Sequence, residues 1–580
     1  MEGRASGLSV AGRIVVMVVI AGLAFAGWWL MKHKGGETIG GIDLKGAQEK
    51  LKVGAVPEGV TTQKDYTYVP EEKLPPVKGA SNYKWNANDP VVNFPINVWI
   101  GWLPIVAANH GFEPNTESIF YKKYKFKVRI SLIDDPVQAR DAFITGDSHI
   151  LWGTLDMMAL FAPGLMQDSR TAPRIYQQVD WSSGGDGIVV RDSVKNVADL
   201  SGKTIVYAQN SPSQYYLATL LIQGGVDPRK VSHLYTKTAF EASAAFVSDR
   251  SRQIEGCVSW APDIYNISKQ VPGTKLLSTT ADASKLIADV WAARADFARD
   301  HPEIIKGLVA GIFEAIGELD TKADGTRKNP QLFEQACAWL AKGYSFPVED
   351  IKKMCGDAHS TNFGENRGFF LDASNATNFE RTWDRINYVY GQLGRVDKPV
   401  PFDKVMDFSV MKQLDASGVF SGQKDTYSAS FSAADWGKVA EKPLLTKVIR
   451  IRFFTNSSNP FELKRDDYNR PVPSTMYDPN VKKTVDDVAT MVKQFDRCLI
   501  KIVGHTDASM KGQVPEKLVL DLSQQRADAI KKLLIDKYHF PAEKFQATGM
   551  GWNQPADPNN PNDNAANRRV EINVYPVESG

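Results

Sequence analysis

The chain contains 580 residues, and its 69 lysines and arginines are nearly balanced by 67 aspartates and glutamates, giving a formal net charge of +2. This length is too great for one ordinary core and predicts two or three domains, whereas the near-neutral charge argues against a nucleic-acid-binding protein. The four cysteines form no CxxC pair and no cluster with histidine at zinc-ligand spacing, so we expect neither a metal site nor a cofactor.

An uncharged apolar run occupies residues 14–31, with positive residues on both sides. As a helix it would be about 27 Å long, close to the roughly 30 Å hydrocarbon core of a bilayer. We therefore predict a membrane anchor over residues 1–34. A cleaved signal peptide is the alternative, because Ala24-Phe25-Ala26 is a small-x-small site, but the run continues through Trp28 and Trp29, which suit the membrane interface.

Two segments read as linkers. Residues 35–90 are rich in Gly, Lys, Glu and Pro and lack sustained hydrophobic periodicity, which is typical of a tether. Residues 415–444 are rich in Ser, Ala, Gly and Lys, with few branched apolar residues. These segments separate a large central region, residues 91–414, from a smaller C-terminal one, residues 445–580.

The central region alternates short apolar runs with longer amphipathic stretches, which is the pattern of an α/β domain. The apolar runs are expected as strands and cover residues 96–102, 127–133, 150–152, 187–190 and 204–207.

Two stretches of this region resemble the type II periplasmic substrate-binding proteins. Residues 199–205 (DLSGKTI) precede a Ser-Pro-Ser turn and an expected helix over residues 211–221, which is similar to the second lobe of that family. Residues 99–104 (WIGWLP) resemble the first strand and helix of its nitrate, sulfonate and taurine group. The resemblance implies two α/β lobes joined by two crossings, near residues 184–190 and 278–289, with a second lobe at about 187–284 and a solute bound between the lobes.

Tryptophan and aspartate recur together in the expected loops after strands, where open α/β sheets place their ligands. Aromatic faces and carboxylates suit a cation or an amine, whereas the serines at an expected helix start favour an anion; a zwitterion would satisfy both. Each tryptophan has core packing, and each serine simple capping, as its alternative. The ligand-binding candidates are Trp102, Trp152, Thr154, Asp156, Asp180, Trp181, Ser211, Ser213, Trp260, Asp263 and Asp289.

The C-terminal region has alternating apolar residues from Val448, then expected helices over residues 480–495 and 523–537 and expected strands over 499–503 and 570–575. Its motifs are Gly504-His505-Thr506-Asp507, residues 522–527 (LSQQRA) and residues 567–572 (NRRVEI). Together they resemble the OmpA-like peptidoglycan-binding domain, which implies a βαβαβ-like α/β fold.

That resemblance assigns roles to particular residues. In the family, the aspartate of the His-Thr-Asp turn pairs with the ammonium of diaminopimelate and the arginine of the Leu-Ser-x-x-Arg-Ala motif holds a carboxylate, so these roles fall on Asp507 and Arg526. A plain surface ion pair between the two is the alternative. Further candidates are Asn456, Thr506 and Arg569, and for Arg569 an ion pair that fixes the last strand is equally open.

This sequence departs from the OmpA-like pattern in two places. Val519 stands where the family often has an asparagine, and residues 511–517 are expected to form an extended loop. Both departures affect affinity for the cell wall more than the fold.

Cys337 and Cys355 lie in an expected helical part of the first lobe, where a disulfide and buried free thiols are both open. No catalytic set is recognisable around the eight histidines, so we do not expect an enzyme.

The sequence as a whole predicts an α/β protein of the inner membrane: a transmembrane helix, a two-lobed binding fold and an OmpA-like domain, with the bulk in the periplasm. It would bind a small molecule and peptidoglycan, and it could have a membrane protein partner. The alternatives are a receptor for an ABC importer and an accessory of a stator-like motor, although residues 14–31 lack the membrane aspartate of flagellar stators.

Overall fold

The computed structural model describes residues 38–39, 42–43, 56–72, 74–322, 324–454 and 456–577. Near the N-terminus, β1 (Thr38–Ile39) pairs antiparallel with β2 (Ile42–Asp43). No helix within the described ranges is long and apolar enough to cross a membrane, and the anchor predicted over residues 14–31 lies outside those ranges.

The first lobe contains a four-stranded sheet in the order β13-β6-β12-β5 and a parallel pair, β3 with β4. Its strands are β3 (Val91–Ile96), β4 (Lys127–Leu132), β5 (Ile150–Thr154), β6 (Pro173–Ser182), β12 (Ala288–Arg294) and β13 (Ala358–Ser360). Its helices are α3 (Leu103–Asn109), α4 (Ile119–Tyr124), α5 (Pro136–Thr145), α6 (Leu155–Leu165), α10 (Ala295–Asp300), α11 (Pro302–Leu319), α12 (Pro330–Tyr344), α13 (Val348–Met354), α14 (Phe363–Leu371), α15 (Phe379–Gln392) and α16 (Ser409–Ser417).

The second lobe is a five-stranded sheet in the order β11-β7-β10-β8-β9. Its strands are β7 (Asp186–Arg191), β8 (Thr204–Ala208), β9 (Ser232–Thr236), β10 (Gly256–Trp260) and β11 (Thr274–Thr279), with helices α7 (Pro212–Gln223), α8 (Ala239–Ser248) and α9 (Asp263–Gln270). Every residue of β7 and β10 is buried. For β7 this explains why residues 187–190 read as a short apolar run without alternation.

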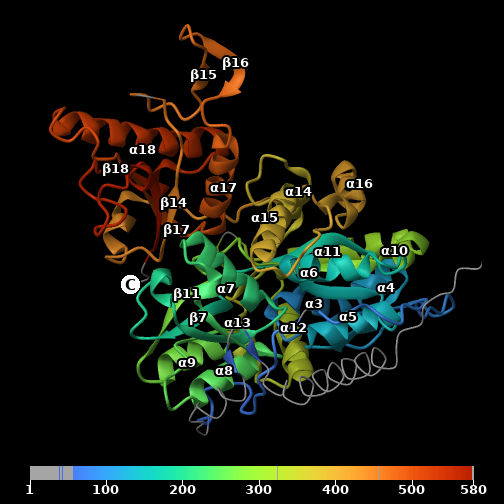
Figure 1. Cartoon of the computed structure of the whole chain (residues 1–580). Helices are drawn as coiled ribbons and strands as arrows, with labels where there is room; N and C mark the ends of the chain where they lie inside the picture. Colours follow the sequence, from blue (N-terminus) through green and yellow to red (C-terminus); the bar gives the residue numbers. More distant parts are fainter. Residues whose placement is uncertain are drawn as a thin grey trace, which may run out of the picture.

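Two short connections join the lobes, residues 183–185 between β6 and β7 and residues 280–287 between β11 and β12. Both fall within or beside the segments that the sequence predicts as crossings. Figure 1 shows the blue and cyan first lobe beside the green second lobe, with α14, α15 and α16 packed on the first.

One expected strand is wrong. The run over residues 96–102 does not extend β3, which ends at Ile96; a turn follows, and then a 3-10 helix over Ile100–Trp102. The Trp102 indole Nε1 donates to Asn97 Oδ1 at 2.7 Å, and the Val98 amide donates to Asp134 Oδ1 at 2.9 Å. These side-chain contacts hold the chain in the turn, which apolar periodicity alone does not show.

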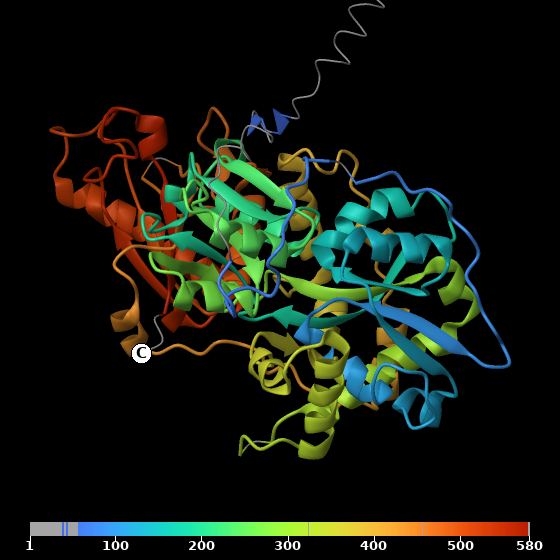
Figure 2. The ribbon, with the colours of Figure 1, turned by 90° about the horizontal axis from the view of Figure 1, so that it is seen from below.

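Residues 56–90, part of the first expected linker, lie along both lobes (Figure 2). The Thr62 amide and hydroxyl donate to Asp263 Oδ1 of the second lobe at 2.8 and 2.6 Å. Further along, the carbonyl of Ser81 accepts from Arg294 Nη2 of the first lobe at 2.7 Å. Because one extended segment is bonded to both lobes, a change in their relative position must also move this segment.

The C-terminal domain has a four-stranded sheet in the order β14-β19-β17-β18, with β17 and β18 parallel. Its strands are β14 (Leu445–Ile449), β17 (Cys498–Gly504), β18 (Phe545–Gly549) and β19 (Val570–Pro576), its helices are α17 (Val481–Gln494), α18 (Glu516–Tyr538) and α19 (Asn564–Asn567), and β15 (Leu463–Arg465) with β16 (Pro471–Met476) forms a projecting hairpin. The predicted α/β alternation is present, but the sequence missed β18 and the hairpin, and α18 begins earlier than residue 523.

This domain packs on the second lobe, where β14 lies against α7. Lys447 Nζ donates to Gln223 Oε1 at 3.1 Å, and the Lys285 amide donates to the carbonyl of Gln494 at 3.2 Å. Burial lowers the pKa of Lys447 to about 8. The C-terminal domain is therefore joined to the lobes by buried polar contacts as well as by the linker.

Tyr427, from the second expected linker, lies where the lobes and the C-terminal domain meet. Its ring stacks on His359 with centroids 3.6 Å apart, and its hydroxyl lies 2.7 Å from Ser183 Oγ in one of the crossings. Lys285 of the other crossing and Arg497 of the C-terminal domain lie over the same ring, at 5.4 and 5.3 Å from its centroid. One side chain therefore touches both crossings and the C-terminal domain.

The four cysteines are free thiols. Cys337 in α12 and Cys355 just after α13 are near enough for the interaction between them to raise the pKa of Cys337 and lower that of Cys355. We expect a thiol titration of the denatured, unreduced protein to give four thiols. A result of two would instead establish one disulfide, and the Cys337→Ser variant would show whether Cys337 and Cys355 form it.

Candidate functional site

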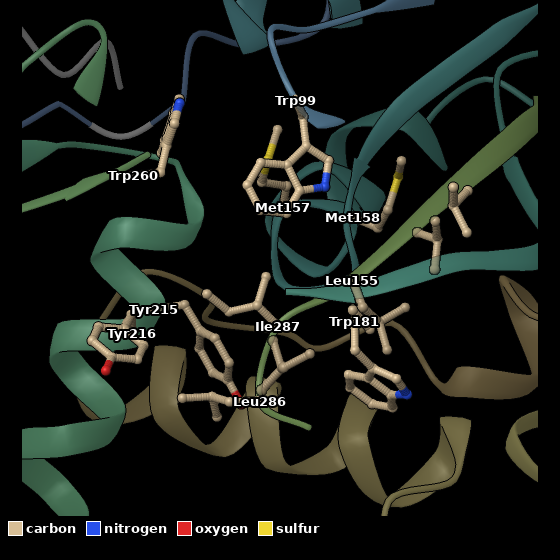
Figure 3. Packing of buried hydrophobic residues seen from close by; sticks show 14 of the residues in the cluster. Trp99, Leu155, Met157, Met158, Trp181, Tyr215, Tyr216, Trp260, Leu286 and Ile287 are labelled. Atoms are coloured by element: carbon tan, nitrogen blue, oxygen red, sulfur yellow. The ribbon is translucent and has the colours of Figure 1, made fainter. Parts of the chain in front are cut away.

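The cleft between the lobes encloses an empty volume of about 530 Å³, including its opening to solvent. The first lobe and the crossings contribute Asn97, Trp99, Asp134, Pro136, Trp152, Thr154, Met157, Ile287 and Asp289 to its lining, and the second lobe contributes Asp186, Ala208, Ser211, Pro212, Lys237, Thr238 and Trp260. Figure 3 shows Trp260 on the side of the second lobe and Trp99 with Met157 on the other side.

Trp99 is fixed in orientation at the wall of the cleft. Its indole Nε1 is 3.3 and 3.2 Å from the two carboxylate oxygens of Asp180, to which it donates. A Cβ at Gly185 would lie 2.3 Å from the Trp99 ring, and a Cβ at Gly101 would lie 1.7 Å from Asp180 Oδ2. Glycine is therefore required at both positions for the indole and the carboxyl to approach the backbone so closely.

Carboxyl groups gather at the crossings, behind and within the cleft wall. Asp180 and Asp289 are paired across β6 and β12. Burial raises the pKa of both carboxyls, and the neighbouring Asp180 raises the pKa of Asp289 further. Burial also raises the pKa of Asp186 and of Asp357 to about 7. Without a cation in the cleft, these groups hold protons more tightly than ordinary aspartates do.

Two buried polar atoms at the cleft have no hydrogen-bond partner among the described residues. Ser182 Oγ donates to Asp186 Oδ2 at 2.6 Å, but Asp186 Oδ1 receives no hydrogen bond there and Trp260 Nε1 donates none. Buried polar groups are normally satisfied, so these atoms are available to a bound molecule.

The predicted ligand residues divide into two groups. Five of them line the cleft, namely Trp152, Thr154, Ser211, Trp260 and Asp289. The remaining predicted residues are Trp102, Asp156, Asp180, Trp181, Ser213 and Asp263, and they do not line it.

Specific contacts occupy residues of this second group. Asp156 accepts from the Tyr390 hydroxyl at 2.9 Å, and Asp263 accepts from the N-terminal segment as described above. The Trp181 ring packs edge-on against Phe369. Their aromatic or carboxylate character is thus used for packing and for tying elements together.

Sequence reasoning missed Trp99, Asp134 and Asp186. Trp99 lies in the stretch that the sequence suggested was strand, so its side chain had no expected role. Asp186 directly follows Gly184 and Gly185 at a crossing. This pair of glycines followed by an aspartate was the sequence feature that could have identified Asp186 as a cleft residue.

In the C-terminal domain, Asp507 and Arg526 do not pair with each other. Asp507 Oδ2 accepts from Arg568 Nη1 at 2.9 Å, and its Oδ1 accepts from the Ser509 amide at 2.8 Å. Arg526 donates from Nε to the carbonyl of Ser457 at 3.2 Å. The simple Asp507–Arg526 ion pair is therefore absent, and Arg568 is a site residue that the sequence analysis overlooked.

Arg526 is held through its Nε atom and the face of its guanidinium group, and not through its two terminal nitrogens. Its guanidinium carbon lies 4.7 Å from the centre of the Phe453 ring, and within the described part of the chain no hydrogen bond from its two terminal nitrogens is found. A planar guanidinium fixed in this way can still take a carboxylate through two parallel hydrogen bonds.

The remaining predicted wall-binding residues lie at different depths. Asn456 is exposed with a φ of 56°, next to the Ser457 carbonyl that Arg526 contacts. Thr506 is buried and its hydroxyl has no partner. Arg569 bonds Glu571 Oε1 from Nε at 2.7 Å, which agrees with the alternative in which it fixes the last strand.

Known protein families match parts of both the central and the C-terminal region. Residues 473–569 match the OmpA family, and residues 182–319 match the family described as NMT1/THI5 like. The taurine-binding periplasmic protein of Escherichia coli (strain K12) is 26% identical over 169 residues, which cover 29% of this chain and 49% of that protein. Outer membrane protein Omp38 of Acinetobacter baumannii is 32% identical over 127 residues, covering 22% and 30%.

Solved structures of periplasmic binding proteins are similar to a little over half of the chain. The periplasmic aliphatic sulphonate binding protein SsuA from Escherichia coli has 18% identity and a TM-score of 0.41, covering 56% of this chain and 99% of its own. The periplasmic nitrate-binding protein NrtA from Synechocystis PCC 6803 has 16% identity and a TM-score of 0.43, covering 58% and 91%.

The chain thus combines a substrate-binding region of the NMT1/THI5-like kind with a C-terminal OmpA domain, the fusion that its motifs predicted. It spans about half or less of the length of the curated relatives described here.

Proposed function

We propose that this protein is anchored in the inner membrane by residues 14–31, holds a small solute between its lobes and binds peptidoglycan through its C-terminal domain. Two observations on one chain support the proposal. The cleft has buried polar atoms without partners among the described residues, and in the region that matches the OmpA family the terminal nitrogens of Arg526 make no hydrogen bond to a described residue. The protein would act as a stationary sensor or envelope link and catalyse no reaction.

The relatives support this location. One is named a periplasmic binding protein and another an outer membrane protein, so both matched regions of this chain would function outside the inner membrane. A receptor for an importer is the second candidate, because the first of these relatives is a taurine-binding protein. A receptor fixed to the wall could not diffuse between permeases, which favours sensing.

Wall binding is tested by sedimenting the full-length protein, purified in detergent, with insoluble peptidoglycan. We expect the protein to sediment with the wall and to be released by free meso-diaminopimelate. Sedimentation that diaminopimelate does not reduce would contradict the assigned site. Solute binding is tested on the same preparation by a thermal-shift screen of amino acids, sulfonates, phosphate and polyamines, where a flat result would contradict a binding role for the lobes.

The junction at Tyr427 leads us to expect coupling between the two sites. Lobe closure on a solute is a hinge motion at the crossings, and Tyr427 touches both crossings and Arg497 of the wall-binding domain. A saturating solute from the screen should change diaminopimelate affinity about fivefold or more, the lower range of typical coupling. Tyr427→Ala should abolish this change.

The control is Tyr468→Ala, because Tyr468 is 79% exposed on the projecting hairpin and touches neither crossing. It should couple as the unmodified protein does. Equal coupling in the Tyr427 variant, or an unchanged diaminopimelate affinity and scattering profile with solute present, would remove the support for coupling.

A further inference from the structure

The charged groups of the cleft are mostly acids. Asp134 and Asp289 reach it from the first lobe, and Asp186 reaches it from the start of β7 in the second lobe. Lys237 is the one lysine or arginine among the described lining residues, and it is exposed at the surface of the second lobe. A buried carboxylate without a cation is costly. The composition of the lining therefore favours a ligand that brings positive charge.

Asp186 gives this preference a definite position. Its side chain is 3% exposed, and it lines the cleft while its Oδ1 has no hydrogen-bond donor among the described residues. The other oxygen is satisfied by Ser182. The oxygen that lacks a donor thus belongs to a side chain that lines the ligand space, and an ammonium group on the ligand would supply the missing donor.

The aromatic lining suits the same group. Trp99, Trp152 and Trp260 line the cleft, and the indole N–H groups of the first two are already used, on Asp180 and on the carbonyl of Ile133 at 3.0 Å. With their N–H groups bonded elsewhere, Trp99 and Trp152 can offer only their rings. The face of an indole attracts a cation.

One feature favours an anion instead. Ser211 and Pro212, at the start of α7, line the cleft, and a helix N-terminus stabilises negative charge. However, the Ser211 hydroxyl is already bonded to the carbonyl of Ala208 at 2.8 Å. An anion here would also lie beside the carboxyl groups, so the helix start could at most hold the acid end of a zwitterion.

From this arrangement we propose that the cleft recognises a small protonated amine, with Asp186 and Asp289 receiving the ammonium group between the tryptophan rings. The inference rests on the proposed solute-binding function and names its ligand class. It predicts that an amine is required and that a sulfonate or phosphate group alone is not sufficient.

The test is calorimetric titration of the full-length protein in detergent with matched pairs that differ only in the amine. The pairs are ethanolamine with ethylene glycol, and taurine with isethionate. We expect the amine of at least one pair to bind and its hydroxyl counterpart to bind at least about 100-fold more weakly. Binding of ethanolamine points to a simple cation, and binding of taurine alone assigns the acid end to the start of α7.

Variants show whether the binding uses this site. Asp186→Asn keeps an acceptor for Ser182 but removes the charge, and we expect about a 100-fold loss of amine affinity; Asp289→Asn should behave similarly. Asp263→Asn is the matched control, since Asp263 is a buried carboxylate of the second lobe outside the cleft, and it should bind within about twofold of the unmodified protein. Thermal unfolding of each variant checks that it folds.

The possible failures are distinguishable. Isethionate or phosphate binding in preference to the amines would overturn the ligand class while leaving solute binding intact. Amine binding that survives both cleft variants would overturn the site. If neither these probes nor putrescine binds while peptidoglycan binding persists, both this inference and the solute-binding part of the proposed function fall.

Discussion

Arg526→Ala is expected to weaken peptidoglycan binding at least about 100-fold, equal to about 2.7 kcal/mol. The guanidinium is held by the Ser457 carbonyl and the Phe453 ring, so it is already oriented before the wall peptide arrives. Truncating one partner of a desolvated, hydrogen-bonded charge pair typically costs about 2–5 kcal/mol. Co-sedimentation with peptidoglycan over a range of protein concentrations measures the loss.

Two further variants separate geometry from charge. Arg526→Lys keeps the positive charge but loses the planar fork, and it should still bind at least about 10-fold more weakly. Arg470→Ala removes an arginine that is 71% exposed on the projecting hairpin, and it should bind normally. Undiminished binding by Arg526→Ala would mean that the wall is held elsewhere on the chain.

The structure indicates that Arg568 competes with the ligand for Asp507, which the sequence did not suggest. In the structure its carboxylate is paired with Arg568, 2.9 Å away, so an ammonium group must compete with this arginine. Arg568→Ala should therefore strengthen the binding of free diaminopimelate, by a few-fold because Arg568 is more than half exposed and such pairs are weak. Weaker binding in this variant would assign Arg568 to the ligand instead.

The sequence was most informative where function depends on a compact motif. Residues 504–507 and 522–527 identify the OmpA domain because they are short, ordered and distinctive. It was less informative about α18, which begins at Glu516 and not at residue 523. Its first turns include Val519, buried, and Leu518, 58% exposed, so no clear apolar face marks them. Likewise, β18 is an edge strand whose residues after Phe545 are not buried, and it shows no alternation.

The cleft shows a different limit. Trp260 and Asp263 lie three residues apart, and the recurring pairing of tryptophan with aspartate predicted that both bind the ligand. In the structure Trp260 lines the cleft, whereas Asp263 opens α9 and bonds Thr62, which is 201 residues away in the chain. Which of two neighbouring side chains faces a ligand depends on such distant partners, and only the folded chain shows them.

The buried carboxyl of Asp186 is expected to make the solute-free protein less stable as the pH rises. Burial raises the folded-state pKa of Asp186 to about 7, compared with about 3.9 in an unfolded chain. Between these values the folded state holds a proton that the unfolded state releases, so stability falls from about pH 4 to about pH 7. Above pH 7 the ionised group costs the folded state roughly 2–4 kcal/mol.

Asp186→Asn should remove this cost, because asparagine is neutral and can still accept from Ser182. Urea unfolding followed by tryptophan fluorescence should therefore show the variant to be about 2–4 kcal/mol more stable than the unmodified protein at pH 8 and close to it at pH 4. Asp65→Asn, at an exposed position, controls for the loss of one carboxylate and should give the same difference at both pH values.

The groups around Asp186 determine how this result is interpreted. Asp156 and Asp357 raise its pKa further by repulsion, and Asp289 and Lys237 share the cleft lining with it. A bound amine would favour the ionised carboxylate, so its affinity should rise with pH through about 7 while the penalty in the solute-free protein persists. A pH-independent difference between the variant and the unmodified protein would show that Asp186 is already ionised in the folded state, with a cation source other than the ligand.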